Sequence, residues 1–483
     1  MDFIKSIIAW LKGVFKIGVK ENVAALNYDI DSVVERHLDS LVPEWAQIYA
    51  DDPPWKMCGE HELDRLCMAK VLCEYIAGYN TAEYEISVGK EGSPAGEFVN
   101  GVLEDNAFAY NLQKLDEYKE AFGGAAIKPY NDGSKIMLDY VQAHNFIPLS
   151  WDNKRIREAI FVSKTIRGDT LYTLLEIHTF QNGKLVIENK LFKAGTNTGA
   201  LGTEVPLNSL TEYANLLPRA EFDKDTPLFV YCYPAIANNK SFDSPLGISR
   251  FANATDTLKS IDVAFNELQR ERESAAKMIF VTDDMVKYRL GDDGVGVRYV
   301  DTTRRVFQVV GAFQQDEGKP FAFDPEFRIQ ERVADINAML NLLCLQAGLS
   351  AGSLSFDEKE GIKTATEIRS ENSRTFKTVS RNQDILRQAL TDLVESIIFL
   401  GKLPEFGKLA AKEYEIKVTF DDSITPDRDT YINEGIKLNT AKLLSKLTFL
   451  QEYYGMTRDD ALAEIERINA ETPAVPDVYG GFD

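Results

Sequence analysis

The sequence predicts an α+β fold in which a mixed body carries two long helices separated by a short β-rich insert. Strand-like runs rich in β-branched and aromatic residues recur between 83 and 235. Two apolar-striped helices are expected at 244–275 and 325–347, and between them the hydrophobic period changes to two. The chain has 483 residues, 44% of them apolar, which suffices for about two to four domains with large cores.

The body begins with helices at 29–80, which Pro53-Pro54 interrupts because proline cannot continue a helix. A helical insert is expected at 100–125. Turn sequences such as Asn182-Gly183 separate the strand-like runs that surround it. Together these elements predict an α+β body rather than an all-helical one.

The first long helix is expected to begin at Ser244-Pro245, with serine as the N-cap and proline as the first helical residue. It would run to about residue 275. An apolar stripe repeats along it at steps of three and four, formed by Leu258, Ile261, Phe265 and Leu268.

The second long helix is expected to begin at Asp324-Pro325 by the same logic and to extend for about 35 Å. Its apolar stripe consists of Ile329, Val333, Ile336, Leu340 and Leu343. Two arrangements fit the pattern: an antiparallel stalk with the β insert at its tip, or a helical hairpin inside a globular core.

Gly348 ends the second helix, and a flexible stretch is expected to follow. Thr364 and Glu367 form a capping box that predicts a third long helix. The first half of this helix is polar, which indicates a solvent-filled surface or a polar neighbour. Its second half carries an apolar stripe of Leu386, Leu390, Leu393, Ile397 and Leu400.

The strand-like run 415–422 comes next, followed by helices at about 427–470 and a flexible Pro/Gly-rich tail. An acidic set precedes and begins those helices. It would either bind a cation or form a solvated turn, and it consists of Asp421, Asp422, Asp427 and Asp429.

The net charge of −21 argues against a protein that grips nucleic acid, because gripping requires cations that neutralise phosphates. It leaves open a protein that surrounds DNA without holding it. The sequence has no phosphate-binding loop, no zinc-protease motif and no nucleophile elbow. Five scattered cysteines and four distant histidines give neither a disulfide framework nor a metal cluster. We therefore expect no catalytic residues, no cofactor and no metal.

The first residues form an amphipathic pattern, with Ile4, Ile8, Leu11 and Phe15 on one helical face. Lysines interrupt the apolar run, so neither a signal peptide nor a membrane span is expected. Such a helix would dock on its own protein or a neighbour, or else lie on a membrane surface. Cysteine usage indicates assembly in a reducing cytoplasm.

Four motifs occur in order along the chain: WAQIYADDPPW (45–55), SPLGIS (244–249), GLSAGSLSFDEKEGIKTATEI (348–368), and VTFDDSITPD with the following helices from 418. Together they resemble the portal proteins of long-tailed phages of Gram-positive hosts. The third is the most specific. The resemblance implies a ring of twelve subunits and divides the chain into 1–243 (wing), 244–275 (stem helix 1), 276–324 (clip), 325–347 (stem helix 2), 348–363 (tunnel loop), 364–426 (channel helix and wing return strand), 427–472 (crown) and 473–483 (tail).

The resemblance further implies a portal vertex protein of the virion, through which double-stranded DNA is packaged and ejected without sequence specificity. Its partners would be the terminase large subunit, then a head-completion adaptor, the major capsid protein and possibly a scaffold. The alternative is another non-enzymatic virion structural protein, such as a minor capsid component.

Two sets of site residues follow from that resemblance. The tunnel loop would contact DNA through Ser350, Gly352, Ser353, Ser355, Lys359 and Lys363, or it would be a mobile surface loop. The clip would meet its partners through Asp283, Asp284, Asp292 and Asp293, which otherwise solvate hairpin turns.

Overall fold

The structure is a computed structural model. It describes residues 26–471 except 27, 29, 59–60, 91, 154, 197–200, 275–277, 283–287, 291–295, 299–306, 311–320, 324–326, 357–371, 405–408, 410–413, 421–427 and 455. The amphipathic start, the Thr364–Glu367 capping box, the tail, Lys359, Lys363, Asp421, Asp422, Asp427 and the four clip aspartates lie outside these residues.

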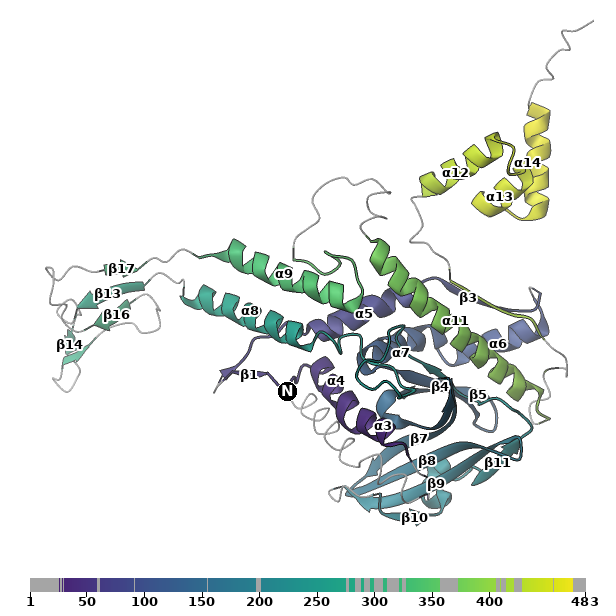
Figure 1. Cartoon of the computed structure of the whole chain (residues 1–483), viewed down its shortest axis with the longest axis horizontal. Helices are drawn as coiled ribbons and strands as arrows, with labels where there is room; N and C mark the ends of the chain where they lie inside the picture. The colour runs from purple at the N-terminus through teal and green to yellow at the C-terminus, as the bar shows by residue number, and fades with distance from the viewer. Residues whose placement is uncertain are drawn as a thin grey trace, which may run out of the picture.

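A large antiparallel sheet forms one layer of the body (Figure 1). Its strand order is β10-β9-β8-β7-β6, and β11 pairs with β9. Apolar side chains of these strands fill the core that lies against the sheet. The bounds are β6 (Phe146–Asp152), β7 (Arg155–Arg167), β8 (Thr170–Gln181), β9 (Lys184–Gly195), β10 (Thr203–Val205) and β11 (Arg219–Phe222).

A second sheet of order β12-β4-β5 and two helix groups complete the body. The helices within residues 32–80 pack on the large sheet. Most buried residues of the helices within 94–122 pack with the smaller sheet. The predicted α+β class is therefore confirmed. The bounds are β4 (Ala125–Asn131), β5 (Ile136–Gln142), β12 (Val230–Cys232), α3 (Ser32–Arg36), the π-helix His37–Leu41, α4 (Val42–Tyr49), α5 (Met68–Asn80), α6 (Pro94–Asp105) and α7 (Phe108–Phe122).

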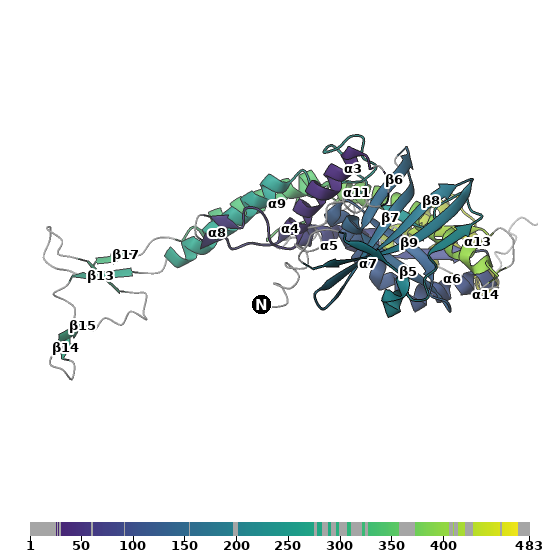
Figure 2. The same cartoon turned by 90° about the horizontal axis from the view of Figure 1, so that it is seen from below.

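Helices α8 (Thr255–Ser274) and α9 (Ile329–Ala347) lie side by side as an antiparallel hairpin. The hairpin projects from the body in both views (Figures 1 and 2). Its base shares one hydrophobic core with the large sheet, through residues such as Leu258, Ile261 and Leu343. The two arrangements that the sequence left open are thus combined: the near half is embedded and the far half stands free of the body.

Both predicted helix starts are wrong. Residues 244–254 are not helical, and α8 begins at Thr255, because most of the segment before it is buried against the body in an irregular conformation. Phe327 and Arg328 are also non-helical, so α9 begins at Ile329, four residues after the proline. The local Ser-Pro and Asp-Pro signals were outweighed by tertiary contacts of the residues that follow them.

The segment between α8 and α9 contains short strands at the far end of the hairpin (Figure 1). β13 (Met278–Thr282) pairs parallel with β16 (Phe307–Val310) and antiparallel with β17 (Phe321–Phe323). β14 (Tyr288–Leu290) and β15 (Gly296–Arg298) form a separate antiparallel pair. The insert is β-rich, as its period of two predicted.

Helix α11 (Ser373–Lys402) crosses the body and buries its predicted stripe, from Leu386 to Leu400, in the second core. β18 (Ile416–Phe420) then pairs antiparallel with β3 (Tyr84–Val88), which joins the end of the chain to the body. The last described helices pack on one another and are α12 (Arg428–Thr440), α13 (Lys446–Tyr454) and α14 (Arg458–Glu471).

Candidate functional site

The junction between body and hairpin is built around Arg250, which is 3% exposed. Its Nε donates to Glu120 Oε2 at 2.6 Å, and its backbone N–H donates to the Glu120 carbonyl at 2.8 Å. Glu120 lies near the end of α7, while Arg250 lies five residues before the start of α8. These bonds fix the residues that lead into the hairpin against the body, which is why 244–254 does not continue as helix.

Four charged side chains are buried together at this junction. Lys119 Nζ lies 2.6 Å from Asp116 Oδ1 and 3.1 Å from Glu120 Oε1. With Arg250, the group holds two cations and two carboxylates, so it is neutral overall. Neutrality matters because an unpaired charge without water is strongly destabilising.

The protonation states at the junction follow from burial and pairing. Burial alone would raise the pKa of Glu120, but Arg250 and Lys119 outweigh it and hold that pKa below its usual value. Burial raises the pKa of Asp116, although Lys119 opposes this. Burial would lower the pKa of Lys119, but the two carboxylates raise it instead.

Two asparagines connect the charged group to α5 and α11. Asn80 Nδ2 donates to Asp116 Oδ2 at 2.8 Å and to Glu120 Oε1 at 3.2 Å. Asn382 Oδ1 accepts from Arg250 Nη2 at 3.1 Å, and its amide donates to Asn80 Oδ1. We call Asn80, Asp116, Lys119, Glu120, Arg250 and Asn382 the junction cluster. It joins α5, α7, the approach to α8, and α11.

The junction cluster explains the polar first half of α11. Thr375, Val379, Asn382 and Gln383 are buried there, so the described part of this half does not simply line a solvent-filled surface. The other expectation, a polar neighbour, is confirmed by the bonds of Asn382. The neighbour lies within the same chain.

Two glycines bring the backbones together at the same place. A Cβ on Gly123 would lie 2.5 Å from the carbonyl oxygen of Gly247, and one on Gly247 would lie 2.4 Å from that of Gly123. Gly123 also has a φ of +81°, which favours glycine. Only glycine at both positions allows the end of α7 to contact the approach to α8 so closely.

Residues 348–356 were expected to be flexible, but hydrogen bonds attach them to α9 and α11. Ser350 is 4% exposed, its N–H donates to Thr375 Oγ1 at 2.9 Å, and Thr378 Oγ1 donates to the Gly348 carbonyl at 2.7 Å. Gly352 N–H donates to Asn341 Oδ1 at 2.7 Å. The described part of the expected tunnel loop therefore bridges α9 and α11.

The far half of the hairpin is held differently. Arg332 Nε lies 2.7 Å from Glu271 Oε2, and its Nη1 lies 2.7 Å from Glu267 Oε2. Arg328 pairs with Glu271 at 3.0 Å. Of the expected stripe, Phe265, Leu268 and Val333 are half-buried, and Ile329 is 48% exposed because it lies at the very start of α9.

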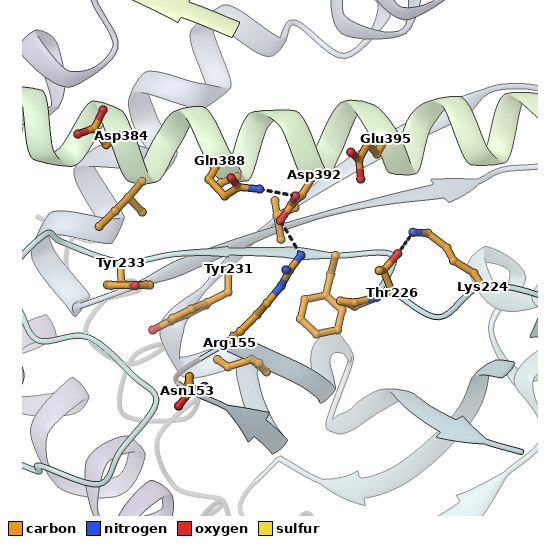
Figure 3. A pocket seen from close by; sticks show the side chains of 16 residues that line it. Asn153, Arg155, Lys224, Thr226, Tyr231, Tyr233, Asp384, Gln388, Asp392 and Glu395 are labelled. Atoms are coloured by element: carbon orange, nitrogen blue, oxygen red, sulfur yellow. Dashed lines mark hydrogen bonds and ion pairs between the residues drawn. The ribbon is translucent and has the colours of Figure 1, made fainter. Parts of the chain in front are cut away.

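A cavity of about 390 Å³ lies between α11 and the body (Figure 3). Arg155 reaches across it to Asp392 at 3.2 Å, and Gln388 donates to the same carboxylate at 2.8 Å. Lys224 bonds Thr226 on the opposite wall. The bond from Arg155 to Asp392 helps to hold α11 on the body, and the described residues that line this cavity include no serine, cysteine or histidine.

Metal binding and membrane crossing find no support among the described residues. No group of three or more His, Cys, Asp or Glu side chains there is placed to hold a metal ion. No described helix combines the length and apolarity needed to cross a membrane.

Sequence reasoning missed the junction cluster. Its members lie at 80, 116–120, 250 and 382, so no local spacing connects them. The available signal was the single arginine in the segment GISRFA and the charged residues that precede Ala-Phe in EYKEAF, which indicate buried partners without identifying them.

The fold is a mixed body with a projecting helical hairpin, and buried charge pairs fix the base of the hairpin. Residues 66–474 match the family described as phage portal protein, SPP1 Gp6-like. The chain belongs to this family, and it is therefore a portal component of a phage virion rather than an enzyme.

Solved structures similar to this chain come from gene transfer agent (GTA) particles. A chain from the neck of an empty particle has 11% identity and a TM-score of 0.43, covering 80% of this chain and 89% of that one. A chain from the native virion has 11% identity and a TM-score of 0.40, with the same coverage. No curated protein gives a significant match.

Proposed function

We propose that the chain assembles into a ring, expected to have twelve subunits, whose channel carries double-stranded DNA into and out of a phage capsid. The observation that carries this proposal is the projecting hairpin with a β-rich tip, in a chain of the portal family. The phage would be of the long-tailed type with a Gram-positive host.

In this proposal the division into wing, stem, clip, channel helix and crown follows the expected boundaries, with the stem helices shortened to α8 and α9. The clip would dock the terminase large subunit during packaging and a head-completion adaptor afterwards. The wing and crown would face the major capsid protein and any scaffold. Assembly would take place in the host cytoplasm.

Sliding of DNA favours an acidic channel. Base contacts would create position-dependent wells, and a dense cationic lining would hold phosphates. Twelve copies carry a formal charge of about −250, part of which would face the channel and keep the duplex centred. Lys359 and Lys363 would touch phosphates transiently, and the exposed Ser355 would face the duplex beside them. Ser350 was also expected to contact DNA, but it is buried, so with Gly352 and Ser353 it would support the loop instead.

Electron microscopy of the purified protein tests the ring. We expect class averages viewed down the axis to show a closed ring with a central hole wide enough for a duplex. A population consisting only of compact monomers at micromolar concentration would refute the proposal.

The role of the tunnel loop has a separate test. Lys359→Ala with Lys363→Ala leaves the docked residues 348–356 intact, so ring assembly should persist while DNA packaging or retention falls. A matched pair, Lys437→Ala with Lys446→Ala in the C-terminal helices, should package normally. Normal packaging by the loop variant would contradict this assignment.

A further inference from the structure

The side of α9 that faces away from α8 carries an exposed stripe. Its members follow one another at steps of four and three, so they share one helical face. Leu342 is 41% exposed and Leu345 is 51% exposed, whereas Leu340 and Leu343, which face the hairpin interior, are buried. The stripe combines carboxylates toward the tip with leucines toward the body, and consists of Glu331, Asp335, Ala338, Leu342 and Leu345.

Helix α8 carries a stripe of the opposite character. Lys259 and Arg270 are exposed and Val263 is half-buried, at steps of four and seven along one face. Glu267 comes four residues after Val263 and three before Arg270, so it lies at the edge of this face, where Arg332 of the same chain already pairs with it. Glu271 lies further round the helix, toward α9. The α8 stripe thus has a cation on each side of a valine. The α9 stripe has two carboxylates followed by an alanine and two leucines, so the two stripes are complementary in charge and in apolar character. Asp256 lies at the body end of the α8 face, where no cation of the α9 stripe meets it.

The two stripes are matched in height along the hairpin. Glu271 contacts both Arg328 and Arg332, so position 271 of α8 lies level with about position 330 of α9. Because both helices rise equally per residue and run antiparallel, Arg270 lies level with Glu331, Val263 with Ala338, and Lys259 with Leu342. Asp335 lies one helical turn from Glu331.

Rotation about an axis parallel to the hairpin keeps every residue at its own height. The α8 stripe of one copy then meets the α9 stripe of the next with cation opposite carboxylate, valine opposite alanine, and the carbon chain of lysine along leucine. We propose that a second copy of this chain occupies the α9 stripe through its α8 stripe, with Arg270 against Glu331 and Asp335. This contact rests on the proposed ring and specifies its subunit interface.

Charge exchange tests the contact. Arg270→Glu places like charges opposite each other, so the protein concentration needed for half assembly should rise about tenfold or more. Adding Glu331→Arg and Asp335→Arg to that variant restores opposite charges and should recover most of the assembly. Sedimentation velocity at low and high salt measures ring and monomer fractions, and circular dichroism checks that each variant is folded.

Arg272→Glu is the matched control, since Arg272 is exposed on the same helix but bonds Gln269 and points to another face. It should assemble like the parent. Leu342→Ser with Leu345→Ser tests the apolar end and should also weaken assembly. If the parent chain forms rings and neither Arg270→Glu nor the serine pair weakens them, the interface is wrong while the ring stands. A parent chain without rings would refute the proposed function itself.

Discussion

The junction cluster and the far half of the hairpin both use arginine–glutamate pairs, but in opposite environments. At the junction, Arg250 and Glu120 are almost completely buried, and Asn80, Lys119 and Asn382 satisfy their remaining groups. At the far half, Arg328 and Arg332 meet Glu267 and Glu271 close to solvent. The same chemistry therefore has different consequences at the two ends of one hairpin.

Burial decides what each pair contributes. Buried partners cannot be replaced by water, so removing one leaves an uncompensated charge and the geometry is rigidly specified. Exposed partners lose little when separated because water and salt replace them. The hairpin is thus fixed firmly at its base, whereas its far half can adjust to neighbouring molecules at low cost.

Removal of the buried arginine should have the largest effect. Arg250→Met leaves Glu120 buried without its main partner, and we expect a loss of about 3–5 kcal/mol in the free energy of unfolding, measured by urea denaturation. Arg250→Lys keeps the charge but not the two-nitrogen geometry and should recover part of the loss. A loss below about 1 kcal/mol for Arg250→Met would show that the junction cluster does not fix the hairpin.

The backbone contact at the junction should come next. Gly123→Ala brings a Cβ against the Gly247 carbonyl at a φ of +81°, and we expect a loss of about 2–4 kcal/mol in thermal unfolding experiments. Gly133→Ala has a φ of +100° but no atom within 4 Å, so it isolates backbone strain and should cost about 1 kcal/mol. Equal losses would mean that the close approach at Gly123 contributes nothing.

The sequence predicted elements whose signals are local and periodic. The stripe Leu386–Leu400 is buried as expected, because one apolar face on a helix has a single way to be covered. The β-rich insert and β18 were found for the same reason. The fold class and the order of these elements thus follow from local signals, chiefly the hydrophobic period and the enrichment in β-branched and aromatic residues.

The first residues of α8 and α9 could not be predicted from such local signals. Ser244 is 0% exposed and its hydroxyl accepts from Leu246 N–H, so it forms a local turn while Arg250 bonds a residue 130 positions away. The Arg328 N–H bonds Glu271 instead of following a cap at Asp324. Such partners are set by the tertiary fold, and the junction cluster escaped prediction for this reason.

Acid should weaken the body before it weakens the far half of the hairpin. Burial lowers the pKa of His37 to about 4, against 6.5 when unfolded. The unfolded chain therefore binds the extra proton first, so this stabilisation is complete above pH 6.5 and is lost as the pH falls from 6.5 to 4. His37 contributes up to about 3 kcal/mol to that loss.

His37→Phe removes this titration, so the free energy of unfolding should fall less steeply between pH 6.5 and 4 than in the parent. The exposed His61 provides the control, since His61→Phe should leave the slope unchanged. An unchanged slope in His37→Phe would show that burial of this imidazole does not control acid stability. His144, whose pKa burial also lowers to about 4, adds a second contribution of the same sign.

The exposed pairs should give the smallest effect. Arg332→Gln removes both ion pairs to Glu267 and Glu271, yet the free energy of unfolding should fall far less than in Arg250→Met, and the difference from the parent should shrink further at high salt. Urea denaturation at low and high ionic strength measures it beside Arg250→Met. If Arg332→Gln lowered the free energy of unfolding as much as Arg250→Met does, and independently of salt, the far half of the hairpin would be as firmly fixed as its base. The distinction between the two ends would then be wrong.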